Sequence, residues 1–144
     1  MKKENLFGYV PAIATPFNKK GKIMEDAFVD LFEFLIERGA TCVCIAGDNG
    51  ESWSLSAEER GRLVRVAKDT SRGRVPIMMG ISAPTIDASL SYIRAAEENG
   101  ADVLLSMPQT YVLKASDAEL MARFDKVSEA TNKPLVLYNS PRRM

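Results

Sequence analysis

The sequence predicts an α/β fold built on a parallel sheet. Short apolar runs alternate along the chain with longer segments in which apolar residues recur at helical spacing. The short runs are apolar throughout, which is typical of strands covered on both faces, and helices separate them. The pattern fits either a segment of a (β/α)8 barrel or an open doubly wound sheet, and periodicity alone does not choose between them.

Five strands are expected in this sheet. The residues that flank the strands repeat after about sixty positions: Gly-Ala pairs precede the second and fourth strands, and prolines begin the third and fifth. The predicted strands span residues 9–14, 41–46, 76–79, 102–107 and 134–138.

Four helices are expected between the strands. Ser56 and Ser116 each stand three residues before a glutamate, which is the pattern of a capping box at a helix start. Glycines follow three of the helices, where a left-handed residue is wanted: Gly39, Gly73 and Gly100. The predicted helices span residues 25–38, 57–72, 86–99 and 117–131.

The composition indicates one globular domain spanning residues 1–144, with 46% apolar residues and 19 basic against 19 acidic side chains. This balance creates no field that would attract nucleic acid or an anionic membrane. No apolar run approaches the ~18 residues of a membrane span, and the first residues lack the apolar stretch of a signal peptide. We therefore expect a cytoplasmic protein with no nucleic-acid or membrane partner.

Histidine is absent from the sequence. The usual general base near neutral pH, the Ser-His and Cys-His nucleophile pairs and most catalytic zinc sites are therefore excluded. We expect no metal and no cofactor. Cys42 and Cys44 lie two residues apart in an apolar run, where disulfide geometry is rarely met, so they are expected to be small core residues.

Polar residues gather in the loops that follow the strands, where ligands bind in both candidate architectures. The loop at residues 47–52 is the richest. Its two glycines allow a tight turn and a close approach of backbone N–H groups to an anion, and it runs toward a helix start. It matches neither a P-loop nor a dinucleotide fingerprint. The alternative is a plain turn between strand and helix.

Three other features have both a functional and a structural interpretation. Tyr138, at the end of the fifth predicted strand, is a candidate proton-relay phenol, or else an aromatic residue that closes the end of the core. Arg142 and Arg143 would clamp a carboxylate, or else are solvated. The basic residues of the second helix are expected to form a solvated surface, since acidic residues interleave with them: Arg60, Arg62, Arg65, Lys68 and Arg72.

A series of short motifs runs in order along nearly the whole chain. They are Ala12-Ile13-Ala14-Thr15-Pro16-Phe17, Gly39-Ala40, Gly47-Asp48-Asn49-Gly50-Glu51-Ser52, Leu55-Ser56-Ala57-Glu58-Glu59-Arg60, Val75-Pro76-Ile77-Met78-Met79-Gly80, Gly100-Ala101-Asp102, Met107-Pro108 and Pro134-Leu135-Val136-Leu137-Tyr138-Asn139-Ser140-Pro141. At these spacings the sequence resembles the pyruvate-dependent Schiff-base lyases typified by dihydrodipicolinate synthase and N-acetylneuraminate lyase. The resemblance selects the (β/α)8 barrel and implies that the chain covers the first four β/α units plus strand five, the N-terminal part of one barrel domain.

In that family a barrel lysine attacks the keto carbon of pyruvate or a larger 2-keto acid, and the imine becomes an electron sink for aldol cleavage, condensation or dehydration. The amine must be neutral to attack. The family's lysine comes from the sixth strand, whereas the lysines here fall in tails, turns or helices. We therefore expect the nucleophile to lie outside this chain, whose lysines are Lys2, Lys3, Lys19, Lys20, Lys22, Lys68, Lys114, Lys126 and Lys133.

The resemblance also implies roles for residues of the loop after the second strand. Gly50 matches a family glycine. Asp48 and Asn49 stand where the family usually has two hydroxyl residues that grip the carboxylate of the keto acid. Because a carboxylate at Asp48 repels a substrate carboxylate, Asn49 and nearby backbone N–H groups are expected to bind that group and Asp48 to meet a distal hydroxyl or amine.

Three further site residues come from the other loops. Tyr138 matches the tyrosine that shuttles protons near the imine, and Arg143 matches the arginine at the entrance. Thr110 is a candidate substrate-binding residue in the loop after the fourth strand. Dihydrodipicolinate-forming members have a Tyr-Tyr pair after the proline of this loop, whereas this chain has Gln109-Thr110-Tyr111, with the tyrosine displaced by one place. In those members the second tyrosine enters the site of a neighbouring subunit, so this departure weakens the expectation of a proton relay between subunits.

Two functions follow from these expectations. The first is a lyase that acts on pyruvate or a related 2-keto acid as a homo-oligomer, with the imine lysine missing from this chain. The second is a catalytically inactive half-barrel that self-associates or complements a missing half, because its first and fifth strands would be open edges and interior apolar side chains would face water.

Overall fold

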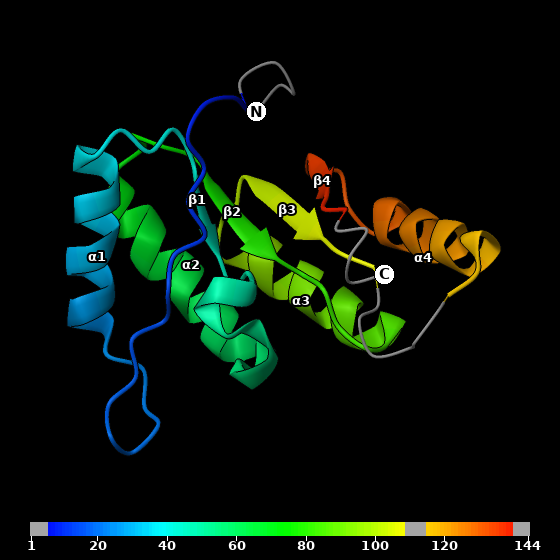
Figure 1. Cartoon of the computed structure of the whole chain (residues 1–144), viewed down its shortest axis with the longest axis horizontal. Helices are drawn as coiled ribbons and strands as arrows, with labels where there is room; N and C mark the ends of the chain where they lie inside the picture. Colours follow the sequence, from blue (N-terminus) through cyan, green and yellow to red (C-terminus); the bar gives the residue numbers. More distant parts are fainter. Residues whose placement is uncertain (1–5, 109–114, 140–144) are drawn as a thin grey trace.

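The structure is a computed structural model that describes residues 6–108 and 115–139. It contains one four-stranded parallel sheet in the order β1-β2-β3-β4, with a helix between consecutive strands (Figure 1). In chain order the elements are α1 (Glu25–Glu37), β1 (Val43–Ile45), the 3-10 turns η2 (Asp48–Gly50) and η3 (Ser52–Ser54), α2 (Ala57–Ser71), β2 (Ile77–Gly80), α3 (Ile86–Glu98), β3 (Val103–Ser106), α4 (Asp117–Glu129) and β4 (Leu135–Leu137). Strands that neighbour in sequence also neighbour in the sheet, as in a barrel wall, without the reversal of an open doubly wound sheet.

The helix starts follow the predicted capping boxes. The Ser56 side chain accepts from the Glu59 backbone N–H, and the Glu59 carboxylate accepts from the Ser56 N–H at 2.9 Å. Ser116 and Glu119 repeat the arrangement at α4. Each cap is worth about 1 kcal/mol of helix stability. None of the helices in the described part of the chain is long and apolar enough to cross a bilayer.

The prediction of a regular strand over residues 9–14 is wrong. Residues 9–14 run beside β1, but only Ala12 forms a bridge, parallel to Cys44. The Ile13 N–H donates to the Cys44 carbonyl at 3.0 Å, and the Cys44 N–H donates to Pro11 at 2.9 Å. Pro11 has no N–H of its own, so the ladder lacks a donor within the run. The segment therefore holds the position of a strand at the edge of the sheet with few ladder bonds.

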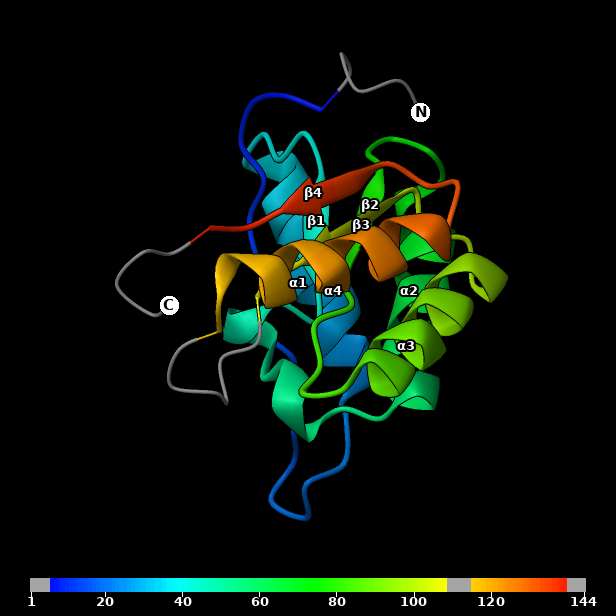
Figure 2. The ribbon, with the colours of Figure 1, turned by 90° about the vertical axis from the view of Figure 1, so that its right-hand side faces the viewer.

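The two faces of the sheet differ. All four helices lie on one side of it (Figure 2). Val43, Ile45 and Ile77 point to that side and pack with Phe28 and Phe32, each fully buried. The one-sided arrangement is that of a barrel wall, whose other face points to the barrel interior.

The face opposite the helices carries a smaller apolar cluster. Cys42, Cys44, Met78 and Val103 are buried there, and partly buried residues pack against them: Leu6, Val10, Ala12, Leu105 and Val136. The expectation that interior side chains face water therefore fails for the centre of the sheet. On β4, Val136 packs against this cluster, whereas Leu137 alternates to the helix side with Leu135 and is 52% exposed at the edge of the sheet.

Candidate active site

A cavity of about 360 Å³ lies at the carboxyl ends of the strands. It brings together Asp48 and Asn49, which follow β1, with Tyr138, which follows β4. Parallel strands place their carboxyl ends at one edge, and so residues ninety positions apart in the sequence meet there. Gly47 completes the polar wall, and apolar residues line the rest: Val10, Ala12, Leu105 and Met107.

The loop after β1 is folded into two short turns. The Gly50 N–H donates to the Gly47 carbonyl and the Glu51 N–H to the Asp48 carbonyl, each at 3.0 Å. The Ser52 N–H also turns back, to the Gly47 carbonyl at 3.3 Å. Glu51 takes a left-handed conformation with φ of 52°, which is unusual for a residue with a side chain. The backbone N–H groups of Gly50, Glu51 and Ser52 thus donate within the loop.

Gly50 is enclosed from behind. Its carbonyl accepts from the Thr15 hydroxyl at 2.8 Å, and Thr15 is 5% exposed. A Cβ at Gly50 would lie 2.9 Å from the Ile13 carbonyl oxygen, closer than real Cβ contacts. A residue with a side chain would therefore push the loop off the segment before α1. The structure thus requires a glycine at position 50 on steric grounds.

The start of the same loop is fixed by a second close approach. Ala46, the residue after β1, is left-handed with φ of 53°. Its carbonyl oxygen would lie 2.1 Å from a Cβ placed on Gly80 at the end of β2, so only glycine fits at that position. Non-glycine residues in this conformation cost roughly 1–3 kcal/mol and cluster at functional sites. Two of them, Ala46 and Glu51, bracket Asp48 and Asn49.

The prediction that Arg60 is solvated is wrong. Arg60 is 1% exposed. Its Nη1 donates to the Gly80 carbonyl at 2.8 Å, its Nη2 to the Ser52 carbonyl and its Nε to the Leu55 carbonyl at 3.4 Å. Its Cζ lies 3.7 Å from the centre of the Tyr92 ring, and burial lowers the pKa of the guanidinium.

Arg60 therefore ties the loop after β1 to the end of β2. The sequence did hold a signal for its burial. Arg60, Val64, Ala67 and Ser71 follow one another at helical spacing, and all four are buried. The acidic neighbours of Arg60 suggested a surface, whereas its place on the apolar stripe decides its environment. The solvated interpretation does hold for Arg62, Arg65 and Arg72.

Tyr138 is not a buried aromatic at the end of the core. It is 47% exposed, and its backbone N–H donates to the Ser106 carbonyl at 2.9 Å, which continues the β3–β4 pairing by one residue. Asn49 is also exposed, and Asp48 is half-buried. Thr110 and Arg143 lie outside the described residues, as do Tyr111 and Arg142.

The cysteines behave as the sequence predicts. Both are buried, unpaired thiols. Burial raises the pKa of Cys42 from 9.0 to about 11 and that of Cys44 to about 12. Neither thiol is therefore a ready nucleophile at neutral pH.

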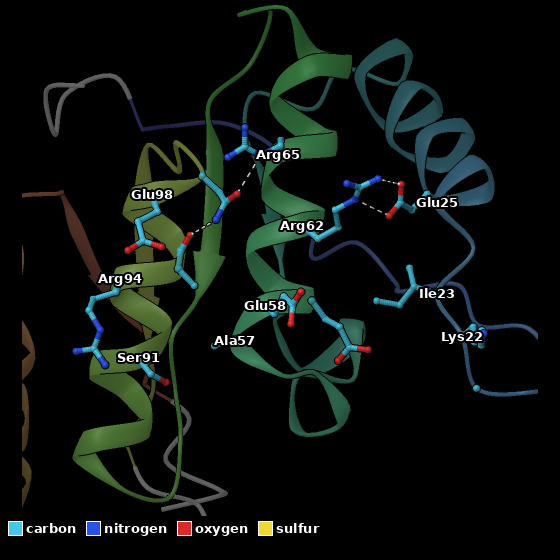
Figure 3. Close-up of a pocket in the computed structure, with 14 residues that line it drawn as sticks. Lys22, Ile23, Glu25, Ala57, Glu58, Arg62, Arg65, Ser91, Arg94 and Glu98 are labelled. Atoms are coloured by element: carbon cyan, nitrogen blue, oxygen red, sulfur yellow. Dashed lines mark hydrogen bonds and ion pairs between the residues drawn. The ribbon is translucent and has the colours of Figure 1, made fainter.

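Another cavity lies on the outer side of the helices (Figure 3). It has a volume of about 700 Å³ between the turn at Gly21, α2 and α3. Acidic and basic side chains alternate around it, and Arg62 forms a two-pronged ion pair with Glu25 at 2.8 and 3.0 Å. The four acidic and four basic side chains of its wall balance, so the cavity offers no net charge to a charged ligand. This groove is a charged helix surface, and the site with converging functional groups is the smaller cavity.

Comparison with known proteins agrees with this geometry. The family model for the "Dihydrodipicolinate synthetase family" matches residues 5–144. The chain belongs to this family. The 4-hydroxy-tetrahydrodipicolinate synthase of Salinibacter ruber is 36% identical over 136 residues, which are 94% of this chain and 45% of that protein.

Solved structures of the family share the fold. A prophage protein from E. coli K12 that belongs to the dihydrodipicolinic acid synthase family, solved in complex with pyruvate, superposes with a TM-score of 0.88 at 29% identity, over 96% of this chain and 46% of its own. The N-acetylneuraminate lyase of Mycoplasma synoviae gives 0.86 at 25% identity, over 98% and 49%. The chain thus spans about half the length of the relatives it matches, and its parallel sheet is half of a (β/α)8 barrel.

Proposed function

We propose that this chain forms the N-terminal wall of a lyase site that binds pyruvate or a related 2-keto acid and acts through a Schiff base. The observation that carries the proposal is the shared cavity of Asn49 and Tyr138 at the carboxyl ends of β1 and β4. Family membership supports the reaction class, and the pyruvate complex of the E. coli prophage protein supports the substrate class.

The reaction begins when a neutral lysine amine attacks the keto carbon. Loss of water leaves a protonated imine, which accepts the electron pair of the C–C or C–H bond that breaks next to it. The resulting enamine then takes up a proton or donates its electron pair to a new carbon–carbon bond. None of the lysines in the described part of the chain lies in a strand, so we assign the imine lysine to residues outside this sequence. The 144-residue chain alone is then inactive, and its share of the chemistry is binding and proton transfer.

Tyr138 is proposed as the proton carrier of this half-site. A phenol exchanges protons with an alcohol or a water that forms at the keto carbon, provided that it lies within hydrogen-bond reach. Its 47% exposure and its place in the wall of the cavity leave the hydroxyl accessible. Thr110 and Arg143 remain proposals for the loop over the substrate and for the entrance.

Asn49 is proposed to bind the carboxylate of the keto acid. The N–H groups of Gly50, Glu51 and Ser52 donate within the loop, so they are not assigned to the carboxylate. The Asn49 side-chain amide, a neutral donor, takes that role. Gly50 contributes by letting the loop lie against Thr15. Asp48 is assigned to a distal hydroxyl or amine of the substrate, because two carboxylates repel each other.

A titration of the 15N-labelled chain with pyruvate tests the assignment. We expect saturable shifts at Asn49 and Tyr138 with a dissociation constant on the order of 1 mM or weaker, because a ligand of six heavy atoms makes few contacts. Asn49→Ala weakens binding at least fivefold, whereas Asn132→Ala, an exposed amide after α4, leaves it unchanged. Equal shifts in the wild type and in Asn49→Ala would refute the role of Asn49.

The second function, an inactive half-barrel that self-associates, is favoured by the β4 edge. β4 pairs with β3 alone, and its Leu137 and the following Tyr138 are 52% and 47% exposed. Open parallel edges pair with other strands. Light scattering at tens of micromolar distinguishes the two states, and a monodisperse monomer would count against self-association.

A further inference from the structure

Two asparagines of this chain are followed directly by a glycine: Asn49-Gly50 in the loop after β1 and Asn99-Gly100 at the end of α3. Asparagine deamidates when the backbone nitrogen of the next residue attacks its side-chain amide carbon. A following glycine favours this attack, because it has no Cβ to hinder the approach and its backbone turns freely. Both pairs are therefore candidate modification sites from their sequence.

The backbones of the two pairs are held in the same way. The Gly50 N–H donates to the Gly47 carbonyl at 3.0 Å, and the Gly100 N–H donates to the Glu97 carbonyl at 3.1 Å. In each pair, the attacking nitrogen must leave a bond to the carbonyl three positions back. The Thr15 hydroxyl also holds the Gly50 carbonyl, but that group lies beyond the peptide that has to turn. The backbone bond that must break is thus of the same kind in both pairs.

The side chains of the two asparagines are held differently. The Asn99 Nδ2 donates to the Ala95 carbonyl at 2.8 Å, and its Oδ1 accepts from the Arg65 Nε at 3.1 Å. A Cβ on Gly61 would lie 2.5 Å from this Nδ2, so the amide also packs closely against α2. Asn49 is exposed, and its side chain forms no hydrogen bond with another described residue. Its amide carbon is therefore free to turn toward the next nitrogen, whereas that of Asn99 is fixed.

We propose that Asn49 is the site at which the folded protein deamidates, and that the fold protects Asn99. The Gly50 nitrogen gives its proton to water and bonds to the Asn49 Cγ, and the Cγ–Nδ2 bond breaks with release of ammonia. Water then opens the cyclic imide. Cleavage at the side-chain carbonyl gives aspartate, and cleavage at the backbone carbonyl gives isoaspartate, in which the chain runs through the former side chain. Water is the only co-reactant.

This modification changes the cavity at the strand ends. Asn49 lines that cavity with Asp48 and Tyr138, so either product adds a carboxylate where the intact loop presents a neutral amide. The added charge repels an anionic ligand. Isoaspartate also lengthens the backbone by one atom, which disturbs the close fit of Gly50 against the Ile13 carbonyl. The effect on ligand binding rests on the proposed function, whereas the deamidation itself does not.

Peptide mapping by mass spectrometry measures the reaction without any ligand. The chain is incubated at mildly alkaline pH, folded and in denaturant, and the aspartate and isoaspartate formed at both positions are followed. In the folded chain we expect Asn49 to react on the order of tenfold faster than Asn99, whose two side-chain hydrogen bonds must break first. In denaturant the two rates become similar. Equal rates in the folded chain, a faster reaction at Asn99, or a ratio that persists in denaturant would each overturn the proposal.

A matched pair of variants tests the protection of Asn99. Arg65→Met, an exposed change on α2, frees the Asn99 Oδ1. We expect faster deamidation at Asn99 and an unchanged rate at Asn49. Arg62→Met removes the same charge from the same helix, where Arg62 pairs with Glu25, and serves as the control. An unchanged rate at Asn99 in Arg65→Met would contradict protection by this hydrogen bond.

Asn49→Asp, which reproduces the aspartate product, tests the consequence for the cavity. In a pyruvate titration we expect it to bind about fivefold more weakly than Asn49→Ala, because it adds a charge as well as removing the donor. Equal or tighter binding by Asn49→Asp would refute the effect on the cavity. If the wild type binds no pyruvate, the proposed function fails, while the ratio of the two deamidation rates still decides the modification site.

Discussion

Arg60 and Arg123 are both buried almost completely, and they differ in what surrounds them. Each of the three nitrogens of Arg60 donates to a carbonyl, and the guanidinium also lies over the Tyr92 ring. Arg123 has acceptors at one nitrogen only. The comparison shows that burial alone does not determine how fully a guanidinium is hydrogen-bonded. A guanidinium whose three nitrogens all donate holds several chain segments together, whereas Arg123 is held through its Nη2.

Replacing Arg60, whose three guanidinium nitrogens all donate hydrogen bonds, has the largest expected effect on stability. Arg60→Met leaves the carbonyls of Ser52, Leu55 and Gly80 without their donor, and we expect about 3 kcal/mol less stability in urea unfolding. In Arg60→Met we expect hydrogen exchange at the Gly50 and Glu51 amides to be faster than in the wild type, because the loop after β1 is no longer held to β2. Arg65→Met, an exposed change on the same helix, is the control. If the two variants are equally stable, Arg60 does not hold these segments together.

The buried cysteines extend the comparison to groups that are buried in their neutral form. Their folded pKa values of about 11 and about 12 exceed the ordinary 9.0. The unfolded chain therefore loses these protons first as the pH rises, so unfolding becomes more favourable above about pH 9 and continues to do so up to the folded values. Unfolding at pH 8 and pH 10 measures this loss. The double variant Cys42→Ala/Cys44→Ala lacks both thiols, so we expect it to lose less stability between pH 8 and pH 10 than the wild type. A loss as large as that of the wild type would assign the effect to other groups.

The exposed ion pair has the smallest expected effect. Arg62 and Glu25 make two short hydrogen bonds, yet Arg62 is 61% exposed, so water and salt compete for both partners. Arg62→Met changes the midpoint of urea unfolding by less than Arg60→Met does, and added salt removes the difference from the wild type. A larger loss than in Arg60→Met would reverse the ranking that burial predicts.

Much of the fold follows from local sequence signals. The capping serines and the alternation of apolar runs with helical segments predict every helix and four of the five strands, because these signals act over a few residues. Residues 9–14 fail as a strand because Pro11 removes a donor. The environment of Arg60 was missed, since its acceptors at Ser52 and Gly80 come from segments that only the fold brings together.

The candidate site was predictable in part for the same reason. Strand ends in a parallel sheet meet at one edge, so Asp48, Asn49 and Tyr138 were expected together and line one cavity. Their functional roles rest on the resemblance to the family and remain proposals. Three features were not visible in the sequence: the left-handed Ala46, the internal use of the loop N–H groups and the unsatisfied Arg123.

The most direct test of the proposed half-site is reductive trapping with pyruvate and sodium borohydride. The chain is treated alone and together with the complementary C-terminal half of the Salinibacter ruber relative, and mass spectrometry locates the modified lysine. We predict no adduct on this chain alone, and an adduct on a lysine of the added half that forms only when this chain is present and weakens with Asn49→Ala. An adduct on one of this chain's own lysines would contradict the account.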